Sequence, residues 1–110
     1  MHNLSEEYKT LVSIAERTGG QPGSFGAEDV IYVVVHGNRI LASHALPGVR
    51  IEAAETGDGI DARITVQAGT KVSKPVHLCF GHLAASGRQV IRSRIFLEEE
   101  SSAEFQAHCI

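Results

Sequence analysis

The chain has 110 residues, of which 43% are hydrophobic and 5% are aromatic, and its formal net charge at pH 7 is -3. This length suits one domain with one modest hydrophobic core. The acidic balance and the few aromatic side chains provide neither the basic surface nor the stacking platform that nucleic-acid binding needs, so we expect no nucleic-acid partner.

The N-terminus has no basic segment followed by an apolar run, and the longest apolar run, VIYVVV at residues 30–35, is far too short to cross a bilayer. We therefore expect a cytoplasmic protein without a membrane contact. In that compartment Cys79 and Cys109 are expected to be reduced thiols and not a disulfide.

The first predicted element is an N-terminal α-helix, because apolar residues recur there at helical spacing. These residues are Leu4, Tyr8, Leu11, Val12 and Ala15. The glycine-rich segment GGQPGSFG that follows is interpreted as a linker, since it lacks the GxxxxGK[ST] pattern of a phosphate-binding loop. We assign residues 1–24 to the helix and linker, and residues 25–110 to a second region.

Short strands separated by turns are predicted throughout that second region. VIYVVV and RILA flank Gly37 and Asn38, a pattern typical of a hairpin. The runs VRIEAAE, IDARITV, KVSKPVHLCF and QVIRSRIFL follow, separated by glycine-containing turns. The sequence therefore predicts a mainly β fold.

An internal repeat appears when residues 63–78 are laid over residues 94–109. The stretch RITVQAGTKVSKPVHL then lies over RIFLEEESSAEFQAHC, so that Arg63 coincides with Arg94 and His77 with His108. The shared order of strand, turn and strand suggests successive coils of a β-solenoid, each burying its apolar row on the next.

The stretch KPVHLCFGH carries two residue types that often bind metals. In a strand, Val76, Leu78 and Phe80 share one face, which we expect to be inside, while His77 and Cys79 share the other. We therefore expect His77 and Cys79 on the outer surface as candidate metal or cluster ligands. The alternative is a solvent-facing histidine and a semi-buried thiol, since a structural zinc site takes about four ligands.

The same repeat aligns Cys109 with the inward Leu78. The two cysteines of the chain would then face opposite ways, which disfavours a common site for them.

Charged residues suggest one partner surface. Arg88, Arg92 and Arg94 form the cationic cluster of the sequence, and the repeat places Arg63 beside Arg94. Arg63 and Arg94 are candidate contacts for an acidic partner, with pairing to nearby glutamates as the alternative. Carboxylates such as Asp58 and Asp61 fall around a glycine turn and are interpreted as solvated turn residues, not as an acid–base pair.

The run IEAAETGDGIDARITVQAGTKVSKPVHLCFG, followed by IRSRIFLEEESSAEFQAHCI, resembles the early core of the SufB/SufD proteins, the scaffold subunits of the Suf iron–sulfur cluster assembly machinery. The resemblance covers roughly residues 25–110. It implies the start of a right-handed parallel β-helix, preceded here by the N-terminal α-helix. It also implies a scaffold without catalytic activity that works with the Suf ATPase and another SufB/SufD-like subunit, and a transient iron–sulfur cluster in the complete assembly.

Members of that family are considerably longer, and their cluster-associated cysteines and histidines lie towards the C-terminal side of the core. We therefore expect a truncated β-helix. Its bare end suggests a fragment, a shortened reading frame, or a helix that another chain or a second copy of this one completes. Two alternatives stay open: a small metal-dependent β-barrel enzyme, and a structural β module that binds another protein by strand addition.

Overall fold

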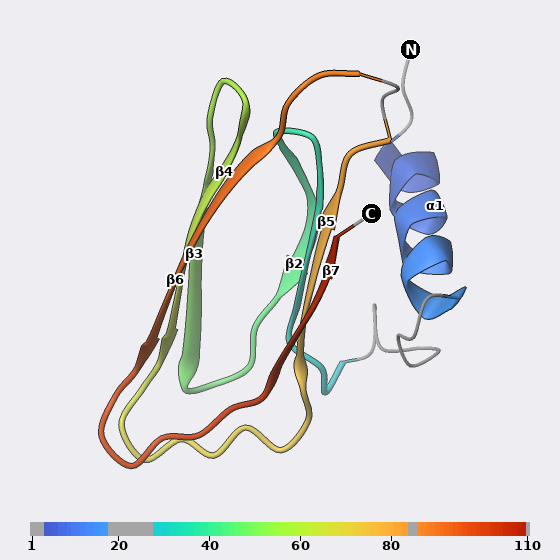
Figure 1. Ribbon diagram of the computed structural model, residues 1–110. Coiled ribbons are helices and arrows are strands. Elements are labelled where there is room, and N and C mark those ends of the chain that lie inside the picture. The colour runs from blue at the N-terminus through green and yellow to red at the C-terminus, as the bar shows by residue number, and fades with distance from the viewer. Residues whose placement is uncertain (1–3, 18–27, 84–85, 110) are drawn as a thin grey trace.

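The computed structural model describes residues 4–17, 28–83 and 86–109 of the chain (Figure 1). The predicted glycine-rich linker and the predicted boundary between residues 24 and 25 lie outside these residues. The described elements are α1 (Leu4–Arg17), β1 (Tyr32–His36), β2 (Arg39–His44), β3 (Val49–Glu55), β4 (Gly59–Val66), β5 (Val76–Gly81), β6 (Val90–Leu97) and β7 (Phe105–Cys109). The predicted mainly β fold is confirmed.

The strands form two open sheets that face each other (Figure 1). One sheet has four strands in the order β2-β1-β5-β7, and the other has three in the order β3-β4-β6. Helix α1 lies against the outer side of the four-stranded sheet. Neither sheet closes on itself within the described residues, so the fold that the β-barrel enzyme alternative requires is not formed there.

The first hairpin joins β1 to β2 through Gly37 and Asn38, as the sequence predicts. The two strands are antiparallel, with His36 opposite Arg39. Gly37 has a φ of 63°, a conformation that glycine adopts without the steric cost that a Cβ brings. The Asn38 side chain donates a 2.9 Å hydrogen bond to the carbonyl of Thr56, which ties this turn to the turn between β3 and β4.

The sequence repeat corresponds to parallel pairing of β4 with β6. Arg63 lies opposite Arg94 and Ile64 lies opposite Ile95, which is the register that the repeat predicts. In the other sheet β5 pairs in parallel with β7, and the connections between the sheets meet at an isolated bridge between residues 71 and 102. The chain forms two units, each made of a strand, a connection and a second strand. The first unit is β4 and β5, and the second unit, β6 and β7, lies beside it (Figure 1).

The predicted alignment of His77 with His108 is wrong by two residues. His77 lies opposite Gln106, and His108 lies opposite Cys79. The reason is that the chain between the bridge and β7 is two residues shorter than the chain between the bridge and β5. Because the slip is an even number of residues, His77 and His108 stay on the same face of the sheet.

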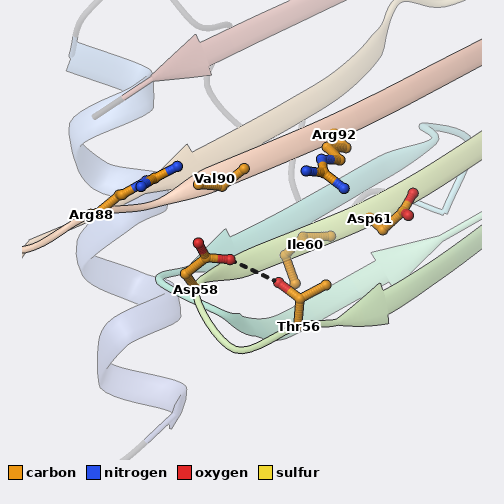
Figure 2. Close-up of a pocket in the computed structure, with 7 residues that line it drawn as sticks. All are labelled: Thr56, Asp58, Ile60, Asp61, Arg88, Val90 and Arg92. Carbon is orange, nitrogen blue, oxygen red and sulfur yellow. Dashed lines mark hydrogen bonds between the residues drawn. The ribbon is translucent and has the colours of Figure 1, made fainter.

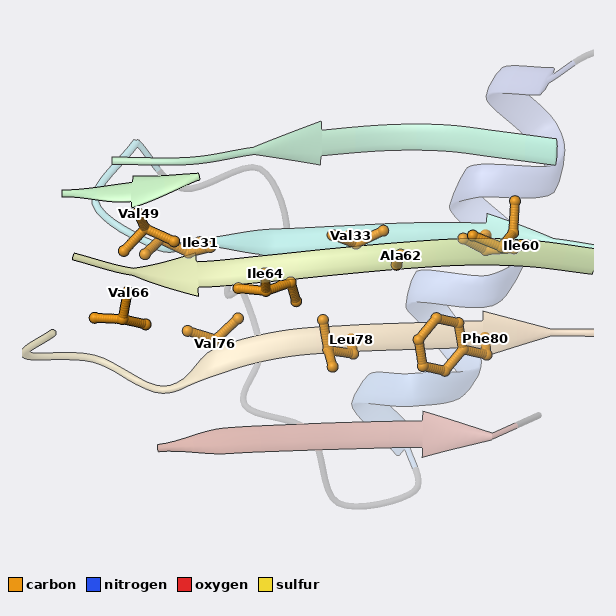
Figure 3. Packing of buried hydrophobic residues seen from close by; sticks show 11 residues of the cluster. Ile31, Val33, Val49, Ile60, Ala62, Ile64, Val66, Val76, Leu78 and Phe80 are labelled. Atoms are coloured by element: carbon orange, nitrogen blue, oxygen red, sulfur yellow. The ribbon is translucent and has the colours of Figure 1, made fainter. Parts of the chain in front are cut away.

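The main core lies between the two sheets and takes alternate side chains from the strands (Figure 3). The buried members are Ile31, Val33, Val35, Val49, Ile60, Ala62, Ile64, Val66, Val76, Leu78 and Phe80. The predicted inward row of β5, formed by Val76, Leu78 and Phe80, is confirmed.

Helix α1 packs on the sheet through the predicted apolar face. Leu11 is fully buried, and Tyr8 and Val12 are partly buried against the same cluster. The side chains of Leu4 and Ala15, also predicted for this face, lie outside the part of the chain that the structure describes. Among the described residues, no helix has both the length and the apolar character needed to cross a membrane.

The contact between α1 and the sheet depends on a glycine at the end of β5. Leu11, Val34 of β1 and Cys79 of β5 form a second buried cluster beneath the helix. A Cβ at Gly81 would overlap the side chain of Leu11. The lack of a side chain at Gly81 therefore lets the helix approach the sheet.

Candidate functional site

Strand β5 places His77 and Cys79 on the face opposite the main core, but that face is not exposed to solvent. His77 is 2% exposed and Cys79 is 0% exposed. The predicted position on the outer surface is therefore wrong. The cause is tertiary packing, because α1 covers Cys79 and the neighbouring strands β1 and β7 flank β5 on both sides.

The ring of His77 stacks on the ring of His108, which reaches it from β7. The ring centroids are 6.3 Å apart and the ring planes are within 4° of parallel. Burial, and secondly the proximity of His108, lowers the pKa of His77 below its ordinary value of 6.5. The folded chain therefore favours the neutral form of His77.

Cys79 lies among apolar side chains under α1. Leu11 and Val34 are fully buried beside it. Tyr8 of α1 packs against the same cluster. Burial is the main cause that raises the pKa of Tyr8 above its ordinary value, and the nearby Tyr32, Glu16 and Cys79 raise this pKa further. Cys79 is a free and fully buried cysteine, so α1 would have to move before an ion or reagent from solvent could reach its sulfur.

Metal binding at β5 has limited geometric support. Within the described residues, no three histidine, cysteine, aspartate or glutamate side chains are placed to hold one metal ion. His77 and Cys79 thus stay a candidate pair, short of the ligand number of a structural zinc site. The backbone of Cys109 lies opposite Phe80, but its side chain lies outside the described part of the chain, so the predicted divergence of the two cysteines stays a prediction.

The structure brings Arg63 and Arg94 together, as the repeat predicts, because they lie opposite each other on β4 and β6. The Nη2 atom of Arg94 is 3.4 Å from Oδ1 of Asp61, and the guanidinium of Arg63 lies 5.1 Å from the ring centre of Phe96. Their intramolecular contacts are thus an aspartate and an aromatic ring, where the sequence suggested glutamates. Such exposed contacts stabilise a fold by about 1 kcal/mol or less, so both arginines are available to a partner.

A hollow lies where the turn between β3 and β4 meets the start of β6 (Figure 2). It is lined by Thr56, Asp58, Ile60, Asp61, Arg88, Val90 and Arg92. Two carboxylates and two guanidinium groups therefore share one opening, and their charges balance. This arrangement suits the recognition of a charged partner group better than acid–base chemistry between paired carboxylates.

Backbone contacts hold this turn against β6. The N–H of Thr56 donates to the carbonyl of Gly59, and the N–H of Val90 donates to the carbonyl of Asp58, both at 2.9 Å. A Cβ at Gly59 would overlap the carbonyl of Val90, so only glycine permits this approach. The hydroxyl of Thr56 also lies 3.4 Å from a carboxylate oxygen of Asp58.

Sequence reasoning predicted the turn but missed the hollow. The signal was present in the repeat, because the register that sets Arg63 against Arg94 also sets Asp61 against Arg92. Reading that row of the repeat for opposite charges would have placed a carboxylate beside an arginine at this end of β6.

Comparison with known proteins finds two relatives with the same description. No known family model matches the chain, and no solved structure matches it. It is 32% identical over 108 residues to an iron–sulfur cluster assembly SufBD family protein of Pyrococcus horikoshii, in an alignment that covers 98% of this chain and 33% of the relative. It is 29% identical over 112 residues to a protein of the same description from Methanocaldococcus jannaschii, in an alignment that covers 97% of this chain and 34% of the relative.

The chain thus spans about a third of the length of the curated relatives that it matches. Both alignments include nearly the whole chain, and they agree with its resemblance to the SufB/SufD proteins. Over nearly its whole length, the chain is similar to about a third of each of two SufBD family proteins of iron–sulfur cluster assembly.

Proposed function

We propose that the chain is a scaffold segment of a cytoplasmic, Suf-type iron–sulfur cluster assembly system and has no catalytic activity of its own. The observation that carries this proposal is the similarity, over 97% and 98% of the chain, to two proteins whose names give the SufBD family and cluster assembly. Those relatives are about three times as long as this chain. The proposed scaffold role is therefore that of the complete assembly, to which this chain contributes one segment.

In this proposal the two parallel units of the fold are coils at the start of a right-handed parallel β-helix. Each unit contributes one strand to each sheet, and the second unit follows the first in parallel register. Stacked coils of this kind are stabilised mainly by contact with their neighbours. The continuous buried row through β4 and β5 supports this arrangement.

The proposed partners are the Suf-type ATPase and another SufB/SufD-like subunit, and the proposed cargo is a transient iron–sulfur cluster of the complete assembly. Arg63 and Arg94 are proposed as partner contacts because both are exposed. A role for His77 and Cys79 in holding the cluster requires α1 to move, because Cys79 is fully buried beneath it.

Capture of purified partners tests the scaffold role. The immobilised chain should retain a Suf-type ATPase or a full-length SufBD scaffold protein, and it should not retain an unrelated ATPase. Replacing Arg63 and Arg94 together by alanine should weaken retention by about tenfold, which is the loss of two exposed charge contacts. Arg50→Ala on β3 is the matched control, and retention of neither partner by the wild-type chain would contradict the scaffold proposal.

Anaerobic incubation with ferrous iron and sulfide tests the cluster site separately. Bound iron and visible absorption that disappear in Cys79→Ser, but not in Cys109→Ser, would support a cluster ligand on β5. If the chain captures a partner but binds no iron, it is a structural segment of the scaffold, and His77 and Cys79 are not cluster ligands.

A structural module that binds by strand addition is the second candidate function. One observation favours it: the side chains of Ile95 and Leu97, in the row of β6 that continues the core, are 41% and 54% exposed. Such a module would bind an extended segment without requiring any Suf component.

A further inference from the structure

We propose that the outer face of the three-stranded sheet binds an acidic α-helix of another protein, one that presents carboxylates a single turn apart. The surface consists of Arg63 of β4 and of Arg92, Arg94 and Phe96 of β6, and is named the arginine face. The inference rests on the proposed scaffold role for its biological setting, since that role makes Arg63 and Arg94 partner contacts.

The arginine face lies on the side of the sheet that points away from the core. Ile64, the next residue after Arg63, is buried between the sheets, so Arg63 points outward. The parallel register sets Arg63 opposite Arg94, and Phe96 opposite Thr65. Arg63 is exposed although β4 is the central strand of its sheet, paired with β3 on one side and β6 on the other. Its exposure is therefore that of a sheet face and not that of an unpaired edge.

Stacking of further coils would not cover this face. Neighbouring coils of a β-helix pair along the edges of their strands, so an added coil would widen the sheet and would not lie across it. The outer face of the four-stranded sheet differs, because α1 packs on it (Figure 1). α1 is the one helix among the described residues, so none of these residues places a helix on the arginine face.

Positive charge on the arginine face is only partly compensated. Arg94 pairs with Asp61 at 3.4 Å. Within residues 4–17, 28–83 and 86–109, no ion pair involves Arg63 or Arg92. Arg92 also lines the hollow at the start of β6, which leaves space beside its side chain (Figure 2). Two guanidinium groups are therefore available to carboxylates of a partner, on a chain whose formal net charge is -3.

An exposed aromatic ring adjoins these charges. Phe96 is 44% exposed, and the guanidinium of Arg63 lies 5.1 Å from the centre of its ring. Arginine and aromatic side chains are enriched where protein interfaces derive most of their binding energy. An apolar partner side chain on Phe96 would bury the ring, while the cation–π contact keeps Arg63 beside it.

The backbone of the sheet selects a helix as the partner element. The N–H and C=O groups of β4 pair with β3 and β6, so the face offers none of them to an added strand. An α-helix satisfies its own backbone hydrogen bonds and needs side-chain contacts alone.

The spacing of the arginines fits the same element. Residues on neighbouring strands lie about 5 Å apart and alternate residues of one strand about 7 Å apart. Side chains at positions i and i+4 of a helix lie about 5–6 Å apart. Carboxylates one turn apart can therefore reach Arg63 and Arg92 together.

A second copy of this chain is a poor occupant. The apolar side of α1 is already buried on its own sheet. On the exposed side, Glu6 is followed one turn later by Lys9 and Thr10. A lysine at that place would meet the arginine face with like charge, which opposes association. The complementary helix therefore belongs to a different protein.

Peptide binding to the intact chain tests the proposal. The probe is a labelled, end-capped, alanine-based helical peptide with glutamates four residues apart and leucines beside them. Its matched control has glutamine in place of glutamate. Fluorescence anisotropy should show the glutamate peptide binding about tenfold more tightly, because the control loses the exposed charge contacts.

Charge substitutions locate the site. Arg63→Glu should abolish the preference for glutamate over glutamine. Lys9→Glu changes the net charge equally at an exposed position on α1 and should leave the preference unchanged. The double variant Arg63→Glu, Arg92→Glu should bind a lysine peptide of the same design more tightly than the glutamate peptide. This gain of binding separates recognition from a loss caused by misfolding.

Two further probes test the chemistry of the partner. A glutamate peptide with proline at its centre keeps the charges but disfavours the helix, so it should bind more weakly than the helical peptide. Single-stranded DNA of equal charge should also bind more weakly. Equal binding of the glutamate and glutamine peptides, equal binding of the helical and proline peptides, or tighter binding of the DNA would overturn the proposal.

Sedimentation of the chain without peptide tests the competing occupant. Self-association that Arg63→Glu abolishes and Lys9→Glu preserves would assign the arginine face to a second copy and would also overturn the proposal. The assays contain no iron, ATPase or Suf scaffold, so their failure would leave the proposed cluster assembly role standing. Failure of partner capture would in turn leave the arginine face standing.

Discussion

Strands β5 and β6 each contribute apolar side chains to the fold, yet they have opposite surroundings. All six residues of β5, Val76–Gly81, are buried, whereas six of the eight residues of β6, Val90–Leu97, are exposed. β5 lies between two strands, the core and α1, while β6 has a neighbour on one side only among the described strands. The position of a strand in the fold, more than its own pattern, decides which of its faces meet solvent.

This comparison separates two kinds of candidate residue. His77 and Cys79 carry the more reactive side chains but lie in the sealed strand, and Arg63 and Arg94 lie on the open side of β4 and β6. In this state of the molecule, partner contacts are therefore better placed at β6 than at β5.

The largest expected contrast comes from removing the same side chain in the two strands. Leu78 on β5 is 5% exposed and Leu97 on β6 is 54% exposed. Leu78→Ala should lower the free energy of unfolding by about 2–5 kcal/mol because it leaves a cavity in the core. Leu97→Ala should lower the free energy of unfolding by less than about 1 kcal/mol. If urea unfolding gave the two variants equal losses of free energy, β5 and β6 would not differ in their surroundings as described.

Gly81→Ala tests the packing of α1 over β5. The added Cβ would overlap Leu11, so α1 should shift, at a cost of about 1–3 kcal/mol in the free energy of unfolding. The thiol of Cys79 should then react faster with a thiol reagent. Gly57→Ala is the control, because a Cβ there meets no atom within 4 Å, and equal thiol reactivity in both variants would contradict the role of the helix.

The buried histidine of β5 gives a pH-dependent contrast. Because burial and His108 lower the pKa of folded His77, the unfolded chain takes up a proton at higher pH than the folded chain. The free energy of unfolding should therefore fall as the pH drops below about 6.5, down to the folded-state pKa. His77→Gln should reduce this slope in urea unfolding between about pH 7.5 and pH 5, and an unchanged slope would rule out His77 as its source.

The smallest effect is expected at the open strand. Arg94→Gln removes an ion pair with Asp61 in which the two side chains are 58% and 40% exposed. Such pairs contribute about 0.2–1 kcal/mol, so the variant should unfold nearly as the wild type does. A loss above about 2 kcal/mol, by the same urea measurement, would mean that Arg94 is structural and not available to a partner.

Much of the β architecture could be predicted from local pattern. Gly37 and Asn38 marked the first hairpin, and alternation placed Val76, Leu78 and Phe80 in the core. The repeat predicted the parallel register of β4 with β6, because residues that coincide in the repeat lie opposite each other in the two strands.

The failures have a common physical cause, which is contact between segments far apart in the sequence. Nothing in KPVHLCFGH shows that α1 packs on it, and the decisive contact is between Leu11 and Gly81. Likewise, the shorter second connection between the sheets moved His108 from His77 to Cys79. The hollow at Arg88 and Asp58 also needed two chain segments to meet before its charges could be recognised.

Hydrogen–deuterium exchange with and without a full-length SufBD scaffold protein tests the central claim most directly. We predict that peptides covering Val76–Gly81 exchange slowly in both samples. Peptides covering Val90–Leu97 should exchange faster than the β5 peptides in the isolated chain, because β6 has a neighbour on one side only among the described strands, and they should slow down when the scaffold protein is added. Equal exchange of the two strands in the isolated chain, or no protection of β6 by the scaffold protein, would contradict a sealed β5 and a partner-binding β6.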